Sequence, residues 1–143
     1  QKVQQQQLPE FPVLAADTSV VLDQKILGKP VNKDHAYDML TQLQGRTHQV
    51  MTAVAITNGM KSETILSISD VKMGEISARK IKDYIGTEES MDKAGSYAIQ
   101  GLGAVLIERI EGSYSGVMGL PLYEVEKLLN NFGVLAWQNP CGT

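Results

Sequence analysis

The pair Asn58-Gly59, set between two long stretches of strand-forming residues, is the feature that most constrains the fold of this chain. In residues 48–56 every second residue would lie on one side of a strand, and that side consists of Val50, Thr52, Val54 and Ile56. Asn-Gly favours a hairpin turn because both residues tolerate positive φ. The pattern therefore predicts an antiparallel hairpin whose return strand covers about residues 62–73.

Three amphipathic helices are expected around this hairpin. The first begins at an N-cap, Asn32, and ends at Gly45, with Ala36, Met39, Leu40 and Leu43 on one face. The second begins near Ser77 and ends near Gly86, with an inner face of Ile81, Tyr84 and Ile85. The third has Pro121 at its first position and ends at Gly133, and its apolar stripe is Leu122, Val125, Leu128, Leu129 and Phe132.

Further strands are expected at residues 13–16, 19–22, 104–107 and 134–137, with a turn at 23–25 and a long loop-like segment at 86–103. Helices and strands are thus mixed along the chain, and one hairpin is clear. This order favours an α/β fold with a mixed sheet and flanking helices over a doubly wound parallel sheet. No internal repeat and no linker divides residues 1–143, which predicts a single domain.

Composition narrows the function classes. A chain of 143 residues with 43% hydrophobic residues can bury one ordinary core, and a formal net charge of −3 argues against nucleic acid as the main partner. One cysteine, Cys141, excludes a scaffold built on internal disulfides. No apolar run approaches the length that spans a bilayer, and the glutamine-rich segment 1–7 has no signal-peptide core, so we expect no membrane partner and a cytoplasmic location.

Asp17 is the first candidate for chemistry. With Thr18 it follows the expected strand 13–16, and the small residues Ala15 and Ala16 beside it leave room for a ligand. A carboxylate at a strand end can act as a general base or hold a divalent ion. The structural alternative is an ordinary turn residue.

Lys29 is the second candidate. It lies between Gly28 and Pro30, just before the first expected helix, where its ammonium group can bind a phosphate as a point charge. The structural alternative is a solvated surface lysine.

Residues 92–103 form the segment with the highest density of glycine and polar residues. Glycine allows backbone N–H groups to approach an anion, and the amide of Gln100 can both donate to and accept from the edge of a base. Gly101 and Gly103 do not complete a dinucleotide fingerprint, because no third glycine opens a helix. The alternative is a glycine-rich turn without a ligand.

The two histidines have no cysteine or histidine partners at metal-ligand spacing. We expect His35 to be an exposed residue in the first turn of a helix and His48 to form a hydrogen bond at a strand end. Cys141 has no visible catalytic partners and follows Asn139-Pro140.

Several blocks together carry a family resemblance. They are Ala-Asp-Thr at 16–18, Ile-Leu-Gly-Lys-Pro at 26–30, Leu-Gln-Gly-Arg-Thr-His-Gln-Val at 43–50, Asp-Lys-Ala-Gly-Ser-Tyr-Ala-Ile-Gln-Gly at 92–101, Gly-Ser-Tyr-Ser at 112–115 and Val-Met-Gly-Leu-Pro-Leu at 117–122. In this order they resemble the Maf (septum-formation-inhibitor) family over about residues 12–132.

The resemblance implies a nucleoside triphosphate pyrophosphatase that releases a nucleoside monophosphate and pyrophosphate and uses a divalent cation, Mg²⁺ or Mn²⁺. It also implies an elongated inosine-triphosphatase-like sheet with surrounding helices and a homodimer. By the same resemblance, Asp17 matches the general base, Lys29 contacts phosphate, Thr18 and Gln100 are linked to the choice of base, and Lys93 binds substrate.

Residues 46–52 and 97–101 resemble the family branch that acts on dTTP and UTP rather than the branch that acts on methylated GTP. A pocket shaped for pyrimidines excludes the larger purines by size. Non-standard pyrimidine nucleotides are therefore further expected substrates.

The sequence departs from the family pattern at two places. The opening Ser-x-Ser-Pro-Arg-Arg loop, with its phosphate-binding arginines, has no counterpart, so we expect the N-terminal part of the domain, a strand and a helix, to be missing from residues 1–143. Lys2 is the candidate for a lysine expected before the Asp17 strand. Lys-Met-Gly at 72–74 replaces an aromatic residue and an arginine. The alternative function is accordingly a weakly active or inactive remnant that binds nucleotide or acts as an interaction module in division control.

Overall fold

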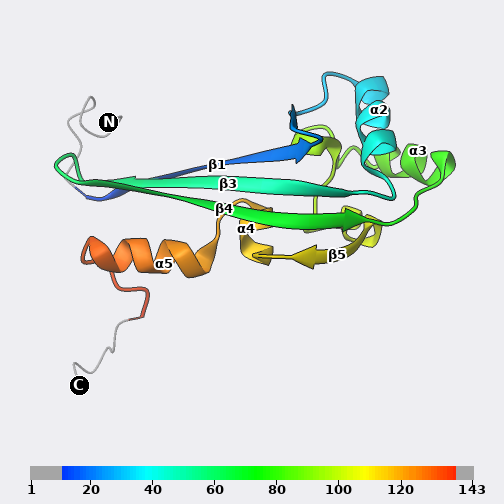
Figure 1. The fold of residues 1–143 in the computed structure, drawn as a ribbon. Helices are drawn as coiled ribbons and strands as arrows, with labels where there is room; N and C mark the ends of the chain where they lie inside the picture. The colour runs from blue at the N-terminus through cyan, green and yellow to red at the C-terminus, as the bar shows by residue number, and fades with distance from the viewer. Residues whose placement is uncertain (1–10, 138–143) are drawn as a thin grey trace.

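The hairpin expected around Asn58-Gly59 forms the centre of the computed structural model, which describes residues 11–137 (Figure 1). Its strands, β3 (Thr47–Thr57) and β4 (Ser62–Met73), pair from Thr57↔Ser62 to Thr47↔Lys72. The turn is longer than the two residues of a minimal hairpin, because Asn58 Oδ1 accepts hydrogen bonds from the N–H groups of Met60 and Lys61 at 3.0 and 2.8 Å. The hairpin and its return strand over residues 62–73 are confirmed.

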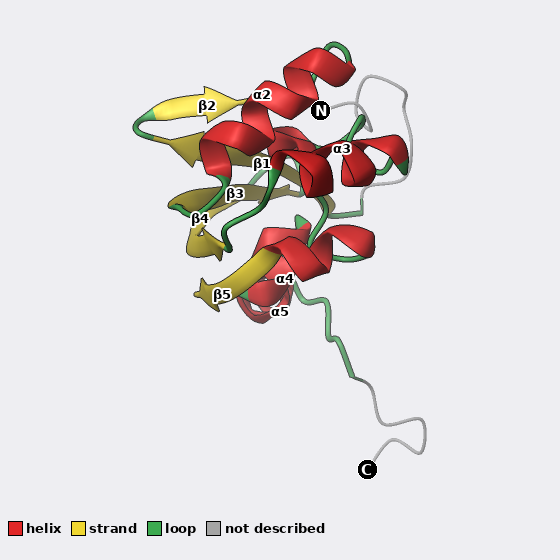
Figure 2. Cartoon of the chain, turned by 90° about the vertical axis from the view of Figure 1, so that its right-hand side faces the viewer, coloured by secondary structure: helices red, strands yellow, loops and turns green. Residues whose placement is uncertain are grey.

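The hairpin belongs to a five-stranded sheet with the order β2-β1-β3-β4-β5. The other strands are β1 (Val13–Leu22), β2 (Lys25–Leu27) and β5 (Ile107–Glu111). All pairings among the described strands are antiparallel. Figure 2 shows the strands in this order from β2 at the top to β5 at the bottom. The α/β class with an elongated sheet and flanking helices is confirmed, while the described part of the sheet is antiparallel rather than mixed.

The longer helices begin at the predicted caps. In α2 (Lys33–Leu43), Asn32 Oδ1 accepts from the His35 N–H at 2.8 Å. In α3 (Ala78–Gly86), Ser77 Oγ accepts from the Lys80 N–H at 3.1 Å. The third helix, α5 (Leu122–Asn131), begins one residue later than expected, because Pro121 is its N-cap and not its first residue. Side chains that satisfy the free N–H groups of the first turn thus set the helix starts.

The helices cover one face of the sheet, which we call the inner face. α2 and α3 enclose the larger core, into which β1 contributes Val20 and β3 contributes Val50. α5 packs Val125 and Leu128 against Val54 and Ile56 near the hairpin turn. The described helices include none long and apolar enough to cross a membrane.

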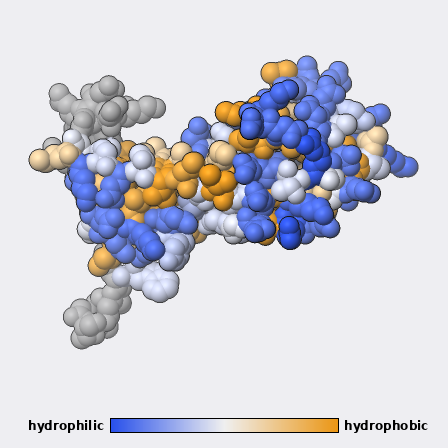
Figure 3. All heavy atoms as spheres, in the orientation of Figure 1, coloured by the Kyte–Doolittle hydropathy of each residue, from blue (hydrophilic) through white to orange (hydrophobic). Residues whose placement is uncertain are grey.

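The opposite, outer face of the sheet is exposed at its centre. Asp17, Ala53 and Leu66 lie side by side in register on this face, and all three are exposed. Leu66 and Ile68 on β4 are 59% and 50% exposed. Figure 3 shows hydrophobic residues gathered over the middle of the long strands.

The two short strands expected at 13–16 and 19–22 are wrong, because β1 runs without a break from Val13 to Leu22. Asp17 therefore lies inside a strand and not at its end. The strand tolerates these polar residues because Asp17 is exposed on the outer face, while Thr18 on the inner face forms a 2.9 Å hydroxyl hydrogen bond with Thr52.

The strand expected at 104–107 is also wrong. Residues 102–106 form a short 3-10 helix, η2 (Leu102–Leu106), and β5 begins only at Ile107. The N–H groups of Leu102 and Gly103 are bound by the Glu89 carboxylate at 2.9 and 2.8 Å, which holds this segment away from the sheet.

Two further differences lie near the C-terminal end of the described chain. A short helix that was not expected, α4 (Tyr114–Met118), is capped by Ser113 Oγ, which accepts from the Gly116 N–H at 3.0 Å. The strand expected at 134–137 does not form, and residues 135–137 instead line an apolar groove beside α5. The expectations for residues 1–7, Lys2 and Cys141 lie outside the described residues.

Candidate functional site

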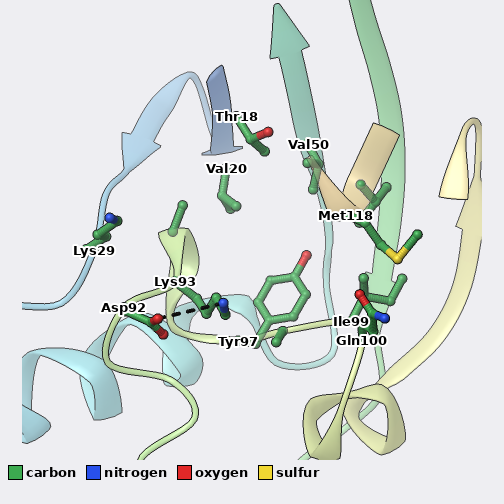
Figure 4. Close-up of a pocket in the computed structure, with 13 residues that line it drawn as sticks. Thr18, Val20, Lys29, Val50, Asp92, Lys93, Tyr97, Ile99, Gln100 and Met118 are labelled. Atoms are coloured by element: carbon green, nitrogen blue, oxygen red, sulfur yellow. Dashed lines mark ion pairs between the residues drawn. The ribbon is translucent and has the colours of Figure 1, made fainter. Parts of the chain in front are cut away.

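A cavity of about 270 Å³ opens on the inner face of the sheet, at the end covered by α2. It lies between the strands β1 and β3, the segment after α3, and α4. The lining residues are Thr18, Val20, Lys29, Val50, Asp92, Lys93, Ala94, Tyr97, Ala98, Ile99, Gln100, Val117 and Met118. Figure 4 shows the strand residues on one side of this space and Lys93, Tyr97 and Gln100 on the other. Four of the five residues expected to form a site, Thr18, Lys29, Lys93 and Gln100, are thus brought together.

Lys29 reaches the cavity because the loop after β2 is tied to the glycine-rich segment. The Gly28 carbonyl accepts a hydrogen bond from the Gly95 N–H at 3.1 Å. Gly95 has a φ of +73°, and a Cβ there would lie 3.0 Å from Val20 Cγ1. Only glycine meets both conditions without strain, so this glycine sets the distance between Lys29 and the segment that carries Lys93.

The polar end of the cavity rests on a row of hydroxyl groups. Thr18, Thr52 and Ser67 lie side by side in register on the inner face. The Thr18 and Thr52 hydroxyls are 2.9 Å apart, and the Thr52 hydroxyl donates to the Gly116 carbonyl of α4 at 2.7 Å. Since Thr52 donates to that carbonyl, the Thr18 hydroxyl donates to Thr52, and the lone pairs of Thr18 remain available toward the cavity.

Tyr97 forms the floor of the cavity and is held by His48. The His48 Nε2 and the Tyr97 hydroxyl are 2.6 Å apart, and the two rings meet edge to face with centroids 5.4 Å apart. Burial lowers the pKa of His48 from 6.5 to about 4, so the ring is neutral at pH 7. Burial, together with the nearby Tyr84, raises the pKa of the Tyr97 hydroxyl. The His48–Tyr97 pair therefore gives the cavity a floor that is uncharged and held by a hydrogen bond.

Asp17 is not among the residues that line this cavity. Its neighbour Thr18 faces inward, and alternation along β1 therefore directs the Asp17 carboxylate to the outer face. However, β2 pairs only with residues 20–22 of β1. Among residues 11–137, the edge of β1 next to Asp17 has no paired strand.

Comparison with known proteins identifies the family. The family model described as "Maf-like protein" matches residues 1–132. The chain belongs to the Maf family. A protein of Methylobacillus flagellatus called "dTTP/UTP pyrophosphatase" is 56% identical over 125 residues, which are 87% of this chain and 63% of that protein. Proteins with the same name from Pasteurella multocida and Nitrosomonas europaea are each 51% identical, over 90% and 93% of this chain and 64% of their own lengths. The chain thus spans less than two thirds of these Maf relatives.

A divalent metal is implied by the Maf family, and the donor set can be tested against it. Among residues 11–137, no cluster of three or more His, Cys, Asp or Glu side chains is positioned to hold an ion. Asp92 is the carboxylate that lines the cavity, and its Oδ2 is 3.8 Å from Lys93 Nζ. One carboxylate fits Mg²⁺, which often takes one or two protein carboxylates and completes its shell with phosphate oxygens and water.

The remaining candidate side chains of this Maf protein have structural partners. His35 is half-buried rather than exposed, and its Nδ1 accepts from the Val31 N–H at 3.1 Å. His48, the second residue of β3, forms the expected hydrogen bond, to Tyr97. Arg46, in the Maf-like block 43–50, donates twice to the Asp23 carboxylate, at 2.7 and 2.8 Å. The Arg46–Asp23 contact joins the segment before β3 to the turn between β1 and β2.

Reasoning from the sequence missed Tyr97, Val117 and Met118 as cavity residues. Tyr97 lies inside the Maf-like block 92–101, so its position was a usable signal. Val117 and Met118 also lie inside a Maf-like block, 117–122, but local periodicity added no signal for them, because α4 has too few residues to show a helical period.

Proposed function

We propose that this chain is the larger part of an enzyme that hydrolyses dTTP and UTP to the monophosphate and pyrophosphate. The observation that carries the proposal is the cavity in which Thr18, Lys29, Lys93 and Gln100 converge from β1, the loop after β2 and the segment after α3. The names of the Maf relatives support the same reaction. The proposal extends to modified pyrimidine nucleotides.

Lys29 and Lys93 bind the phosphates in this proposal. Both side chains lie at the rim of the cavity and are exposed, so their ammonium groups can follow a flexible triphosphate chain. Each supplies a point charge that offsets the negative charge of the phosphates. That charge increases on the leaving pyrophosphate during cleavage, so the lysines stabilise the transition state more than the ground state.

Thr18 and Gln100 select the base. The Gln100 amide carries one acceptor and two donors, which can pair with the alternating carbonyl and N–H groups on the edge of uracil or thymine. The cavity of about 270 Å³ also limits size. Apolar side chains of Val20, Val50 and Met118 around it are suited to the flat faces of a base.

Asp17 acts as the general base that takes a proton from the attacking water. Its position on the outer face requires the triphosphate to pass the edge of β1 that has no paired strand within residues 11–137, while the base occupies the inner cavity. In this proposal recognition falls to Thr18 and proton transfer to Asp17, two consecutive residues of β1 whose side chains lie on opposite faces.

Asp92, together with phosphate oxygens, would hold the divalent ion, for which we propose Mg²⁺ or Mn²⁺. A bound ion of this kind neutralises phosphate charge and polarises the bond to be cleaved. We also propose that residues 1–143 form a single Maf-like domain, that the protein is a cytoplasmic homodimer, and that nucleic acid and membranes are not its partners.

The test is pyrophosphate release by the full-length protein from dTTP, UTP and GTP in the presence of Mg²⁺. We expect turnover of both pyrimidine nucleotides and much slower turnover of GTP. Equal or faster release from GTP would contradict the pyrimidine assignment. A parallel assay of the 143-residue chain addresses the alternative: turnover by the full-length protein alone would identify the shorter chain as a non-catalytic remnant.

A further inference from the structure

The carboxylate of Glu89 is the centre of a hydrogen-bond cluster outside the cavity. It accepts from the Tyr84 hydroxyl at 2.8 Å, from the Leu102 N–H at 2.9 Å and from the Gly103 N–H at 2.8 Å. Burial acts to raise the pKa of Glu89, but these hydrogen bonds and the charge of Lys93 outweigh it, so that the net effect is a lower pKa. Glu89 is thus held as a carboxylate with three donors.

Tyr84 adds a second connection to the same segment. The side chain is buried in α3, and its hydroxyl accepts from the Ala98 N–H at 3.1 Å while it donates to Glu89. The residues on either side of Gln100 are therefore both attached to this cluster: Ala98 through the tyrosine, and Leu102 through the carboxylate.

Glycines make room for this arrangement. Gly101 has a φ of +131°, and a Cβ at this position would collide with the Glu89 carboxylate. A Cβ at Gly103 would lie 2.7 Å from the Tyr84 hydroxyl and would also collide with the Ala98 carbonyl oxygen. The backbone between them can therefore approach the cluster only because these positions lack side chains.

We infer that Glu89 is a positioning residue that fixes the segment 98–101, and with it Gln100, against the cavity. The inference rests on the proposed function for the identity of the ligand, a pyrimidine nucleotide. Glu89 does not line the cavity itself, whereas Ala98, Ile99 and Gln100 do. Its contribution to binding is to order these residues before the ligand arrives, which reduces the loss of conformational freedom on binding.

The substitution Glu89→Gln tests the positioning role of Glu89 with little change in side-chain size. A glutamine side chain has one acceptor oxygen and an NH₂ group in place of the second oxygen. Whichever way it is turned, at least one N–H of Leu102 or Gly103 then faces another donor. Glu88→Gln is the matched control, because it makes the same change one residue earlier, where the carboxylate forms only an exposed contact with Lys33 at 3.6 Å.

The kinetic experiment compares Glu89→Gln and Glu88→Gln in the full-length protein with UTP as substrate. We expect KM to rise about 10-fold for Glu89→Gln with a smaller change in kcat, and both parameters to stay within about 2-fold for Glu88→Gln. In the background of Gln100→Ala the effect of Glu89→Gln should shrink, because the residue being positioned is gone. An undiminished effect in that background overturns the inference.

Amide hydrogen exchange without nucleotide gives a readout that does not depend on the reaction. In Glu89→Gln the amides of Leu102 and Gly103 should exchange about 10-fold faster, while those of the β3–β4 hairpin stay unchanged. Tyr84→Phe should accelerate exchange at Ala98 and provides a second variant if Glu89→Gln fails to fold. Unchanged exchange at all three amides overturns the inference. Absence of nucleotide turnover in the wild-type protein, by contrast, overturns the proposed function alone.

Discussion

The imidazole of His48 and the hydroxyl of Tyr97 are 2.6 Å apart, although 49 residues separate them in the sequence. The two side chains are 2% and 5% exposed, so water cannot replace the hydrogen bond between them. Within the described chain, His48 Nδ1 has no partner. An unpaired lone pair is less unfavourable in a buried site than an unpaired N–H, which indicates that the proton is on Nε2 and points toward Tyr97.

The burial of His48 predicts that the protein loses stability in mild acid. The pKa of His48 is lowered from 6.5 to about 4, so between these values the unfolded chain binds a proton that the folded chain does not. The His48 contribution is fully present above pH 6.5 and is lost as the pH falls toward 4, with a total of about 3 kcal/mol. Urea unfolding at pH 7 and pH 4.5 measures this difference.

The control for that measurement is a variant without the titrating ring. His48→Gln should be less stable than the wild type at pH 7 but should show a smaller loss between pH 7 and pH 4.5. Equal slopes in the wild type and His48→Gln would contradict the assignment to His48.

Asp17→Asn should separate the possible roles of this carboxylate. If Asp17 is the general base, kcat falls about 10²–10⁴-fold in the full-length protein while KM changes much less. If it is chiefly a metal ligand, the variant instead needs a higher Mg²⁺ concentration, and excess metal restores part of the rate. Pyrophosphate release measured across a Mg²⁺ titration distinguishes the two.

Asp70→Asn is a suitable control for that substitution, because Asp70 also lies on the outer side of the sheet but on β4, two strands away from β1 in the strand order. It should leave the rate and the metal requirement unchanged. Wild-type rate, metal dependence and pH profile in Asp17→Asn would remove Asp17 from the site and leave it a structural residue of β1.

Lys29→Met should weaken substrate binding through the loss of one charge at the cavity. The remaining methylene chain keeps most of the side-chain volume, while the phosphate loses an ion-paired donor. We expect KM for UTP to rise about 10-fold or more at low salt. Lys25→Met, on the exposed strand β2, serves as the control and should change KM little. A KM for Lys29→Met equal to that of the control would contradict the phosphate-binding role.

Much of the fold was predictable because local patterns determine it. The Asn58-Gly59 hairpin and the caps Asn32 and Ser77 depend on interactions between residues close in sequence. The continuity of β1 was not predictable from such patterns, since a polar pair at Asp17-Thr18 resembles a strand end. Only the register against β3, with Thr52 opposite Thr18, makes the polar pair compatible with an unbroken strand.

The site also combines features that the local sequence predicts with features that depend on contacts between distant residues. The positions of Lys29, Lys93 and Gln100 at one cavity followed the motif blocks, and the structure brings them together. The segment after them did not follow its local pattern: the apolar run at 104–107 favours a strand, but Glu89, 13 residues before Leu102, binds the backbone that would begin it. A contact over that distance has no signature in the local sequence, and the local pattern therefore predicts a strand that begins before Ile107.

Glu88 lies between α3 and the segment that contains Leu102. At this position we expect glycine to give a more stable protein than alanine, which is the reverse of their order inside a helix. The φ of Glu88 is +64°, a left-handed conformation that is unfavourable for residues with a Cβ by about 1 kcal/mol. Glu88→Gly and Glu88→Ala both remove the exposed contact with Lys33, so their comparison isolates the backbone effect. We expect Glu88→Gly to be the more stable of the two by about 0.5–1 kcal/mol, measured by thermal or urea unfolding.

At Asp83, inside α3 and 74% exposed, the same pair of substitutions should have the opposite order, because alanine is favoured over glycine in a helix. The same order at both positions would contradict the left-handed conformation of residue 88.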